Sequence, residues 1–216
     1  MVFTGSAGCP EFQPNKFKAD LCQICTQKIQ LHSSASEEQV ARALEYAVDT
    51  LATPVYSHKN QHTADGSEGI LYLGGYKPAV NPQFLQDTGI QFIVNTAAGL
   101  TRVLGPRYIK QLEKRSQQFP DIVVRNINLQ DDLIQKIDFK EFEEVSEQIQ
   151  DYLEHGKSVL VHCAQGKSRS AALVTFFLHK LLKISMEECL VHVNMKRRMA
   201  DPNTNFKQQL IQFEKR

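Results

Sequence analysis

The stretch SVLVHCAQGKSRS, residues 158–170, decides how this sequence is interpreted. Residues 158–161 are typical of a buried strand, which appears as a short continuous apolar run. A loop with one glycine follows, and residues 170–182 predict an apolar helix. In such a strand–loop–helix passage, successive backbone N–H groups turn toward one point, where the first turn of the helix adds its own unpaired donors. The stretch therefore predicts an anion site that fits a phosphate group.

Cys163 and Arg169 bound this loop, with five residues between them. A free cysteine has a pKa of about 8.5, and a helix N-terminus or a nearby cation lowers it to roughly 3.5–7.5. We therefore expect Cys163 to be a thiolate at neutral pH. The guanidinium of Arg169 is always charged and can hold two phosphate oxygens at once. Together they predict thiolate attack on a phosphate ester, giving a phosphocysteine intermediate that water then hydrolyses.

The other residues of this stretch have supporting parts in the prediction. Ser170 is expected to hydrogen-bond the sulfur and help it leave, and His162 to orient the loop from behind the cysteine without transferring a proton. Lys167 could favour polyanionic substrates, although an exposed lysine is the plainer interpretation. The residues expected to bind the phosphate, besides Arg169, are Ala164, Gln165, Gly166, Lys167 and Ser168.

Protonation of the leaving group requires an acid, and Asp131 is the candidate. It lies in the segment INLQDD, residues 127–132, just after a predicted strand. The same carboxylate, once ionised, could activate the water of the second step. Asp132 is adjacent, and local spacing does not separate the two.

From about Gly69 onward, predicted strands and helices alternate. This pattern indicates an α/β fold with ligands bound at the carboxyl ends of the strands. The predicted strands are 70–73, 90–94, 122–129 and 158–161, and the predicted helices are 81–88, 108–119, 139–155, 170–182, 186–199 and 205–215.

The chain before Gly69 is predicted to have two parts. Residues 35–68 are interpreted as a helix from Ser36 to Leu51, ended by Pro54, and a polar linker over 55–68. Residues 1–34 hold three of the five cysteines in a C-x12-C-x2-C-x6-H spacing that suits a tetrahedral Cys3His zinc site. The expected ligands are Cys9, Cys22, Cys25 and His32, with His58 or His62 as an alternative fourth ligand. The other interpretation is a tail with incidental cysteines.

The sequence from about Gly69 to Lys215 resembles the dual-specificity phosphatases of the protein tyrosine phosphatase superfamily. The shared signature is His-Cys, five residues, Arg and Ser, at residues 162–170. Further matches are the segments 71–74, 89–90 and 94–95, followed by Pro202-Asn203, Phe206 and Gln209-Leu210. The family arginine before Pro202 is matched to Arg198, which leaves the segment one residue short and puts Met199 where the family has proline.

This resemblance implies a central, mostly parallel twisted sheet flanked by helices, over residues 69–216. It implies hydrolysis of phosphotyrosine, phosphoserine and phosphothreonine in proteins, with no cofactor for catalysis. It favours Asp131 over Asp132 as the acid and assigns Asn203 to support of the loop. The alternatives are a phosphatase of phosphoinositide, RNA or carbohydrate phosphate, and a module that binds phosphorylated partners without turnover.

Composition narrows the remaining classes. A formal charge of +1 and only one short basic run, residues 196–198, argue against nucleic-acid binding. No apolar stretch has the length needed to span a bilayer. An odd number of cysteines without a signal sequence predicts a cytoplasmic or nuclear protein. The run 15–25 looks like a short module of some actin-associated signalling proteins, which suggests a cytoskeletal or signalling partner.

Overall fold

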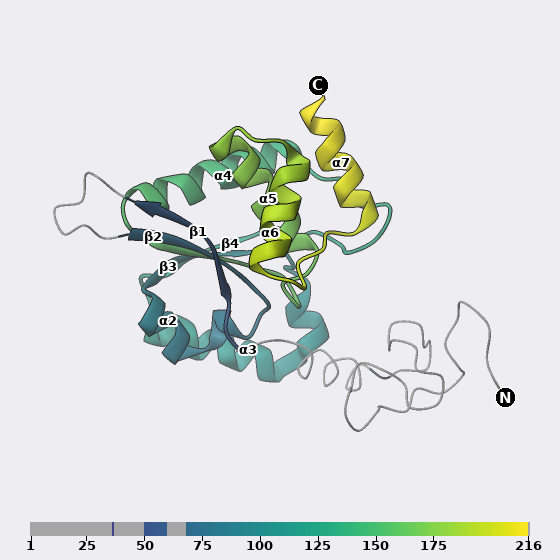
Figure 1. Ribbon diagram of the computed structural model, residues 1–216. Helices are drawn as coiled ribbons and strands as arrows, with labels where there is room; N and C mark the ends of the chain where they lie inside the picture. Colours follow the sequence, from purple (N-terminus) through teal and green to yellow (C-terminus); the bar gives the residue numbers. More distant parts are fainter. Residues whose placement is uncertain (1–35, 37–49, 60–67, 216) are drawn as a thin grey trace. The chain divides into compact units, whose positions relative to one another are not determined.

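The computed structural model describes Ser36, residues 50–59 and residues 68–215 (Figure 1). The chain divides into two compact units, one of residues 1–48 and 99–110 and the other of residues 49–98 and 111–216. The four expected zinc ligands and nearly all of the helix predicted from Ser36 lie outside the described residues. The end of that helix prediction is wrong, because Leu51 lies in a bend and is exposed. In the described ranges, no helix is long and apolar enough to cross a membrane.

The larger unit is built on a five-stranded sheet with the order β1-β2-β5-β3-β4. β2, β5, β3 and β4 pair in parallel, and β1 is an antiparallel edge strand against β2. The prediction of a mostly parallel α/β sheet is therefore confirmed. The strands are β1 (Thr53–Lys59), β2 (Glu68–Gly74), β3 (Ile90–Asn95), β4 (Val123–Asn126) and β5 (Ser158–His162).

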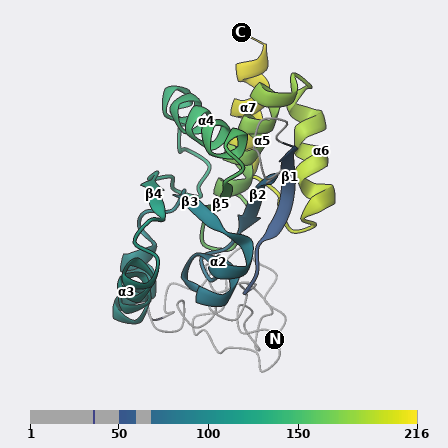
Figure 2. The same ribbon diagram turned by 90° about the vertical axis from the view of Figure 1, so that its left-hand side faces the viewer.

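Helices cover both faces of this sheet (Figures 1 and 2). Helices α4 to α7 lie on one face and α2 lies on the other. Most predicted helices are confirmed within about three residues, but the prediction over 108–119 is wrong at its start, because α3 begins at Leu100. The helices are the 3-10 turn η2 (Pro78–Val80), α2 (Pro82–Thr88), α3 (Leu100–Gln118), α4 (Phe139–Glu154), α5 (Arg169–Leu182), α6 (Met186–Lys196) and α7 (Thr204–Glu214).

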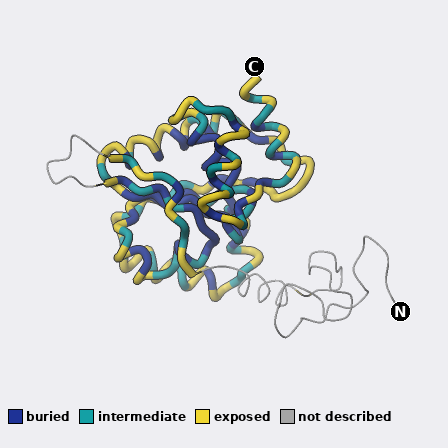
Figure 3. Tube along the Cα trace, viewed as in Figure 1, coloured by how far each residue is buried: buried dark blue, intermediate teal, exposed yellow. Residues whose placement is uncertain are grey.

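The central strand β5 is buried along its whole length (Figure 3). Val159 and Val161 belong to the large apolar cluster that includes α4 and α5, whereas Leu160 joins the smaller cluster on the other face with Phe84 and Ile93. A strand covered on both sides needs apolar residues in both orientations, so its sequence is a run rather than an alternation. This burial fixes the end of β5, from which the anion loop starts.

β1 corrects the linker prediction, because residues 55–59 form a strand. Val55 is the only fully buried residue of β1, and the others are exposed or half-buried. Its backbone pairs with β2, and the ring nitrogen Nε2 of His192 in α6 lies 3.0 Å from the carbonyl oxygen of Val55. An edge strand with one buried side chain shows little apolar periodicity, which explains the wrong prediction.

Candidate active site

The loop between β5 and α5 has its carbonyl groups bonded outward. Successive carbonyl oxygens of residues 164–168 accept hydrogen bonds from groups around the loop. The donors, in order, are Tyr76 N, Arg197 Nη2, Arg197 Nε, Asp201 N and Ala172 N. Because these oxygens are bonded outside the loop, the N–H groups are left to face its interior, as Gly166 N does toward the Cys163 sulfur at 3.2 Å. This backbone geometry is compatible with the predicted anion cradle.

Gly166 makes this turn possible. Its φ of +71° lies in the left-handed region, which side chains other than glycine rarely adopt. A Cβ at this position would also collide with the backbone of Gly74 and Gly75 at the end of β2. The glycine is therefore required both for the bend of the loop and for its close approach to the neighbouring strand.

Cys163 is buried, with only 2% of the residue exposed, and its sulfur faces the loop. It accepts hydrogen bonds from Gly166 N at 3.2 Å and from Ser170 Oγ at 3.2 Å. Burial raises the pKa of the Cys163 thiol, but the charge of Arg169 and hydrogen bonds from Ser170 and the backbone outweigh it, so the net pKa is lowered. A buried sulfur with these donors is stabilised as the thiolate.

His162 lies behind the cysteine. Its Nδ1 is 3.2 Å from the carbonyl oxygen of Cys163, and since a carbonyl only accepts, this nitrogen carries the proton. Thr96 in turn donates to the carbonyl oxygen of His162 from its backbone at 2.8 Å and from Oγ1 at 3.0 Å. Burial lowers the pKa of His162 to about 4, with the charges of Arg115 and Arg169 adding to the effect. A neutral, buried ring that bonds the backbone fits an orienting part.

Arg169 is held loosely at the first position of α5. Its Nη1 is 3.5 Å from the carbonyl oxygen of Leu129, and its Nε is 3.7 Å from Oδ2 of Asp131. Nε is buried and makes no hydrogen bond within the described part of the chain. The guanidinium therefore has an N–H group that could bind an anion in the loop.

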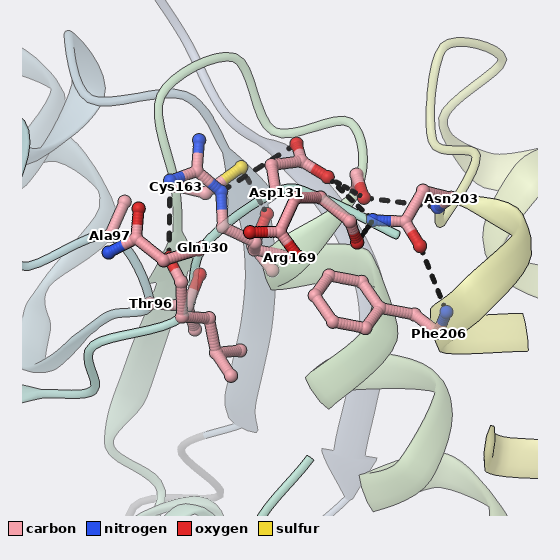
Figure 4. Close-up of polar contacts among 12 residues, drawn as sticks. Thr96, Ala97, Gln130, Asp131, Cys163, Arg169, Asn203 and Phe206 are labelled. Carbon is pink, nitrogen blue, oxygen red and sulfur yellow. Dashed lines mark hydrogen bonds and ion pairs between the residues drawn. The ribbon is translucent and has the colours of Figure 1, made fainter. Parts of the chain in front are cut away.

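The carboxylate of Asp131 faces the loop (Figure 4). Oδ1 of Asp131 accepts hydrogen bonds from Ser168 Oγ at 2.6 Å and from Asn203 Nδ2 at 2.9 Å. The carboxylate of Asp132 instead accepts from the backbone of Ile134 and Gln135 in its own segment. The structure therefore separates two residues that local spacing left equivalent.

Asn203 and Ser168 join three segments at this point. Asn203 N donates to Ser168 Oγ at 3.1 Å, and its side-chain oxygen accepts from Phe206 N at the start of α7. Ser168, although it precedes α5, uses its hydroxyl for Asp131 rather than for capping its own helix. These contacts connect the anion loop, the Asp131 segment and the start of α7.

Arg197 is the residue that the sequence interpretation missed. It belongs to the basic run 196–198 and was given no part in the site, but only 5% of its surface is exposed. Its guanidinium bonds the carbonyl oxygens of Gln165 and Gly166 and Oγ1 of Thr53. Matching Arg197 instead of Arg198 to the family arginine also supplies the one residue that the segment to Pro202 lacked. That deficit was the signal that could have identified Arg197.

The predicted zinc ligands cannot be placed in the same way. His58, the alternative ligand within the described residues, has its Nδ1 3.3 Å from the hydroxyl of Tyr56. Within residues 50–59 and 68–215, no group of three or more His, Cys, Asp or Glu side chains has the geometry of a metal site.

Comparisons with known proteins agree with this geometry. The model of the dual specificity phosphatase catalytic domain matches residues 71–216. Dual specificity protein phosphatase 1 of Arabidopsis thaliana is 31% identical over 145 residues, which are 67% of this chain and 66% of that protein. Human dual specificity protein phosphatase 9 is also 31% identical over 145 residues, 67% of this chain but only 34% of its own length. The crystal structure of human DUSP28 superposes with a TM-score of 0.55 at 25% identity, covering 67% of this chain and 88% of that one.

Proposed function

The chain belongs to the dual specificity phosphatase family, and from this premise we propose that it hydrolyses phosphotyrosine and phosphoserine or phosphothreonine in proteins. The observation that carries the proposal is the Cys163 sulfur, bonded by Gly166 N and Ser170 Oγ inside a loop of inward-facing N–H groups. Its pKa is lowered by Arg169 and by these hydrogen bonds, which favours the thiolate, and it lies in the loop that would hold the phosphate. A buried cysteine with a purely structural role does not require hydrogen-bond donors directed at its sulfur.

In the first step of the proposed mechanism, the loop N–H groups and Arg169 hold the phosphate oxygens. The Cys163 thiolate attacks phosphorus, the bond to the ester oxygen breaks, and Asp131 gives that oxygen its proton. Arg169 turns from Asp131 to the phosphate, because its Nε is free of hydrogen bonds within the described residues and only 3.7 Å from the carboxylate.

In the second step, the Asp131 carboxylate removes a proton from water while the water oxygen attacks phosphorus. The sulfur–phosphorus bond breaks, and the hydrogen bond from Ser170 stabilises the departing thiolate. Inorganic phosphate leaves, and Asp131 is again protonated for the next cycle. His162 and Asn203 touch neither phosphate nor ester oxygen in this scheme, and they act by positioning.

The test is phosphate release from synthetic peptides that carry phosphotyrosine or phosphothreonine, with an aryl phosphate as a small substrate. We expect turnover of all three. Turnover of the aryl phosphate alone, together with hydrolysis of a phosphoinositide or a phosphorylated sugar, would favour the non-protein alternative. Binding of phosphopeptides without any turnover would favour a binding module.

For the N-terminal region we propose a separate module, residues 1–34, in which Cys9, Cys22, Cys25 and His32 bind one structural Zn²⁺. The support is the ligand spacing, and a segment with so little apolar content needs a metal to fold. We expect about one zinc per chain in the purified protein and none in Cys22→Ser/Cys25→Ser. Equal, near-zero zinc in both would rule the site out.

The same proposal extends to partners and location. We assign residues 1–34 to binding of a cytoskeletal or signalling partner, and residues 35–68 to the connection with the catalytic domain, to which β1 adds a strand. A cytoplasmic or nuclear location suits a catalytic thiolate, because these compartments keep thiols reduced. Fluorescence microscopy of the tagged chain, with and without residues 1–34, tests both points.

A further inference from the structure

Two large apolar side chains lie exposed beside the candidate acid. Leu133 is 68% exposed and Ile134 is 85% exposed, and they follow Asp131 by two and three residues. We call this pair the apolar tip. Single exposed apolar residues are common on protein surfaces, but two adjacent ones next to a reactive site need a reason.

The backbone that carries the apolar tip is fixed by hydrogen bonds. Asp132 Oδ1 accepts from Ile134 N at 3.0 Å and from Gln135 N at 2.7 Å. The carbonyl oxygen of Gln135 accepts from Asn205 Nδ2 at 2.7 Å and from Gln209 Nε2 at 2.8 Å, both in α7. None of these bonds uses an atom of the two apolar side chains. The hydrogen bonds already order the backbone that exposes the tip to solvent. Binding at the tip therefore loses little further conformational entropy.

The tip also lies within reach of a bound substrate peptide. Asp131 must contact the ester oxygen, and Leu133 is two residues away, at most about 7 Å along an extended chain. A peptide in extended form advances about 3.3 Å per residue. Side chains one to three positions from the phosphorylated residue therefore pass the tip while the phosphate occupies the loop.

We propose that Leu133 and Ile134 select protein substrates with an apolar side chain one to three residues from the phosphorylated residue. This inference rests on the proposed phosphatase activity and adds the class of peptide that the site prefers. The occupant is the substrate itself, because the exposed apolar surface is continuous with the segment that must touch the ester.

The test compares Leu133→Ser/Ile134→Ser with the unchanged protein on paired phosphotyrosine peptides that carry leucine or serine at these neighbouring positions. We expect the unchanged protein to prefer the leucine peptides by about 10-fold in kcat/KM, the effect of a modest apolar contact. The double variant should lose this preference and keep its turnover of an aryl phosphate, which is too small to reach the tip.

Val123→Ser/Val191→Ser is the matched control, because it removes two exposed valines, 50% and 58% exposed, from β4 and α6. It should retain the preference. No preference in the unchanged protein, or an equal preference in the tip variant, would overturn the inference. Failure of the aryl phosphate reaction in the unchanged protein would instead count against the phosphatase activity.

Discussion

Replacement of Cys163 by serine should abolish phosphate release while leaving phosphopeptide binding in place. The serine hydroxyl is not ionised at neutral pH and is a much weaker nucleophile than a thiolate. The loop N–H groups and Arg169 that hold the phosphate are unchanged. We expect turnover to fall by at least about 10³-fold, as when the nucleophile of a covalent enzyme is removed, and we expect a measurable Kd for the phosphopeptide.

Cys189→Ala is the matched control for this substitution. Cys189 is the other cysteine among the described residues, and burial, together with the charges of Glu188 and Glu214, raises its pKa to about 11. Its thiol is therefore neutral and inert, and its loss should leave turnover within about two-fold. Retained turnover in Cys163→Ser, or an equal loss in both variants, would remove Cys163 from the role of nucleophile.

The ionisation of Cys163 also predicts the acid side of the pH profile. Because its pKa is lowered, the thiolate is present above that pKa and is lost as the pH falls through it. Alkylation of Cys163 by iodoacetamide, followed by mass spectrometry of its peptide, should fall over the same pH range as kcat/KM. A thiol that reacts only well above neutral pH would contradict the geometry of the loop.

The sequence predicted the parallel strands and the loop well because both depend on local signals. β5 is an apolar run, and the loop needs a glycine, a cysteine and an arginine at fixed spacing. β1 was not predicted because it buries a single residue, Val55, and one buried residue gives no alternation of apolar and polar positions. Arg197 escaped it because burial of a charged side chain depends on partners far along the chain, here the carbonyls of Gln165 and Gly166.

The choice between Asp131 and Asp132 shows the same limit at the site. Both are carboxylates after one strand, but Asp131 accepts hydrogen bonds from residues distant in sequence, whereas Asp132 accepts them from its own segment. Ser168 and Asn203 bond Asp131, and the turn at Ile134 occupies Asp132. The sequence gives the type of residue at each position. The direction in which its side chain points depends on contacts that form only in the fold.

Replacement of Asp131 by asparagine should lower turnover of phosphothreonine peptides by about 10²–10⁴-fold, the usual contribution of a general acid. Asparagine keeps a carbonyl oxygen that can accept from Ser168 and Asn203, so the segment stays in place while the transferable proton is lost. An aryl phosphate with a good leaving group needs that proton less and should lose less activity.

Asp132→Asn separates the acid from its neighbour, because the carbonyl oxygen of asparagine can still accept from Ile134 N and Gln135 N. We expect its turnover to stay within about two-fold of the unchanged protein, since Asp132 bonds its own segment and not the loop. If Asp132→Asn instead shows the larger loss, Asp132 is the acid, and the contacts of Asp131 with Ser168 and Asn203 only support the loop. A loss for phosphothreonine peptides and the aryl phosphate by the same factor in Asp131→Asn would show that its carboxylate orders the site and transfers no proton.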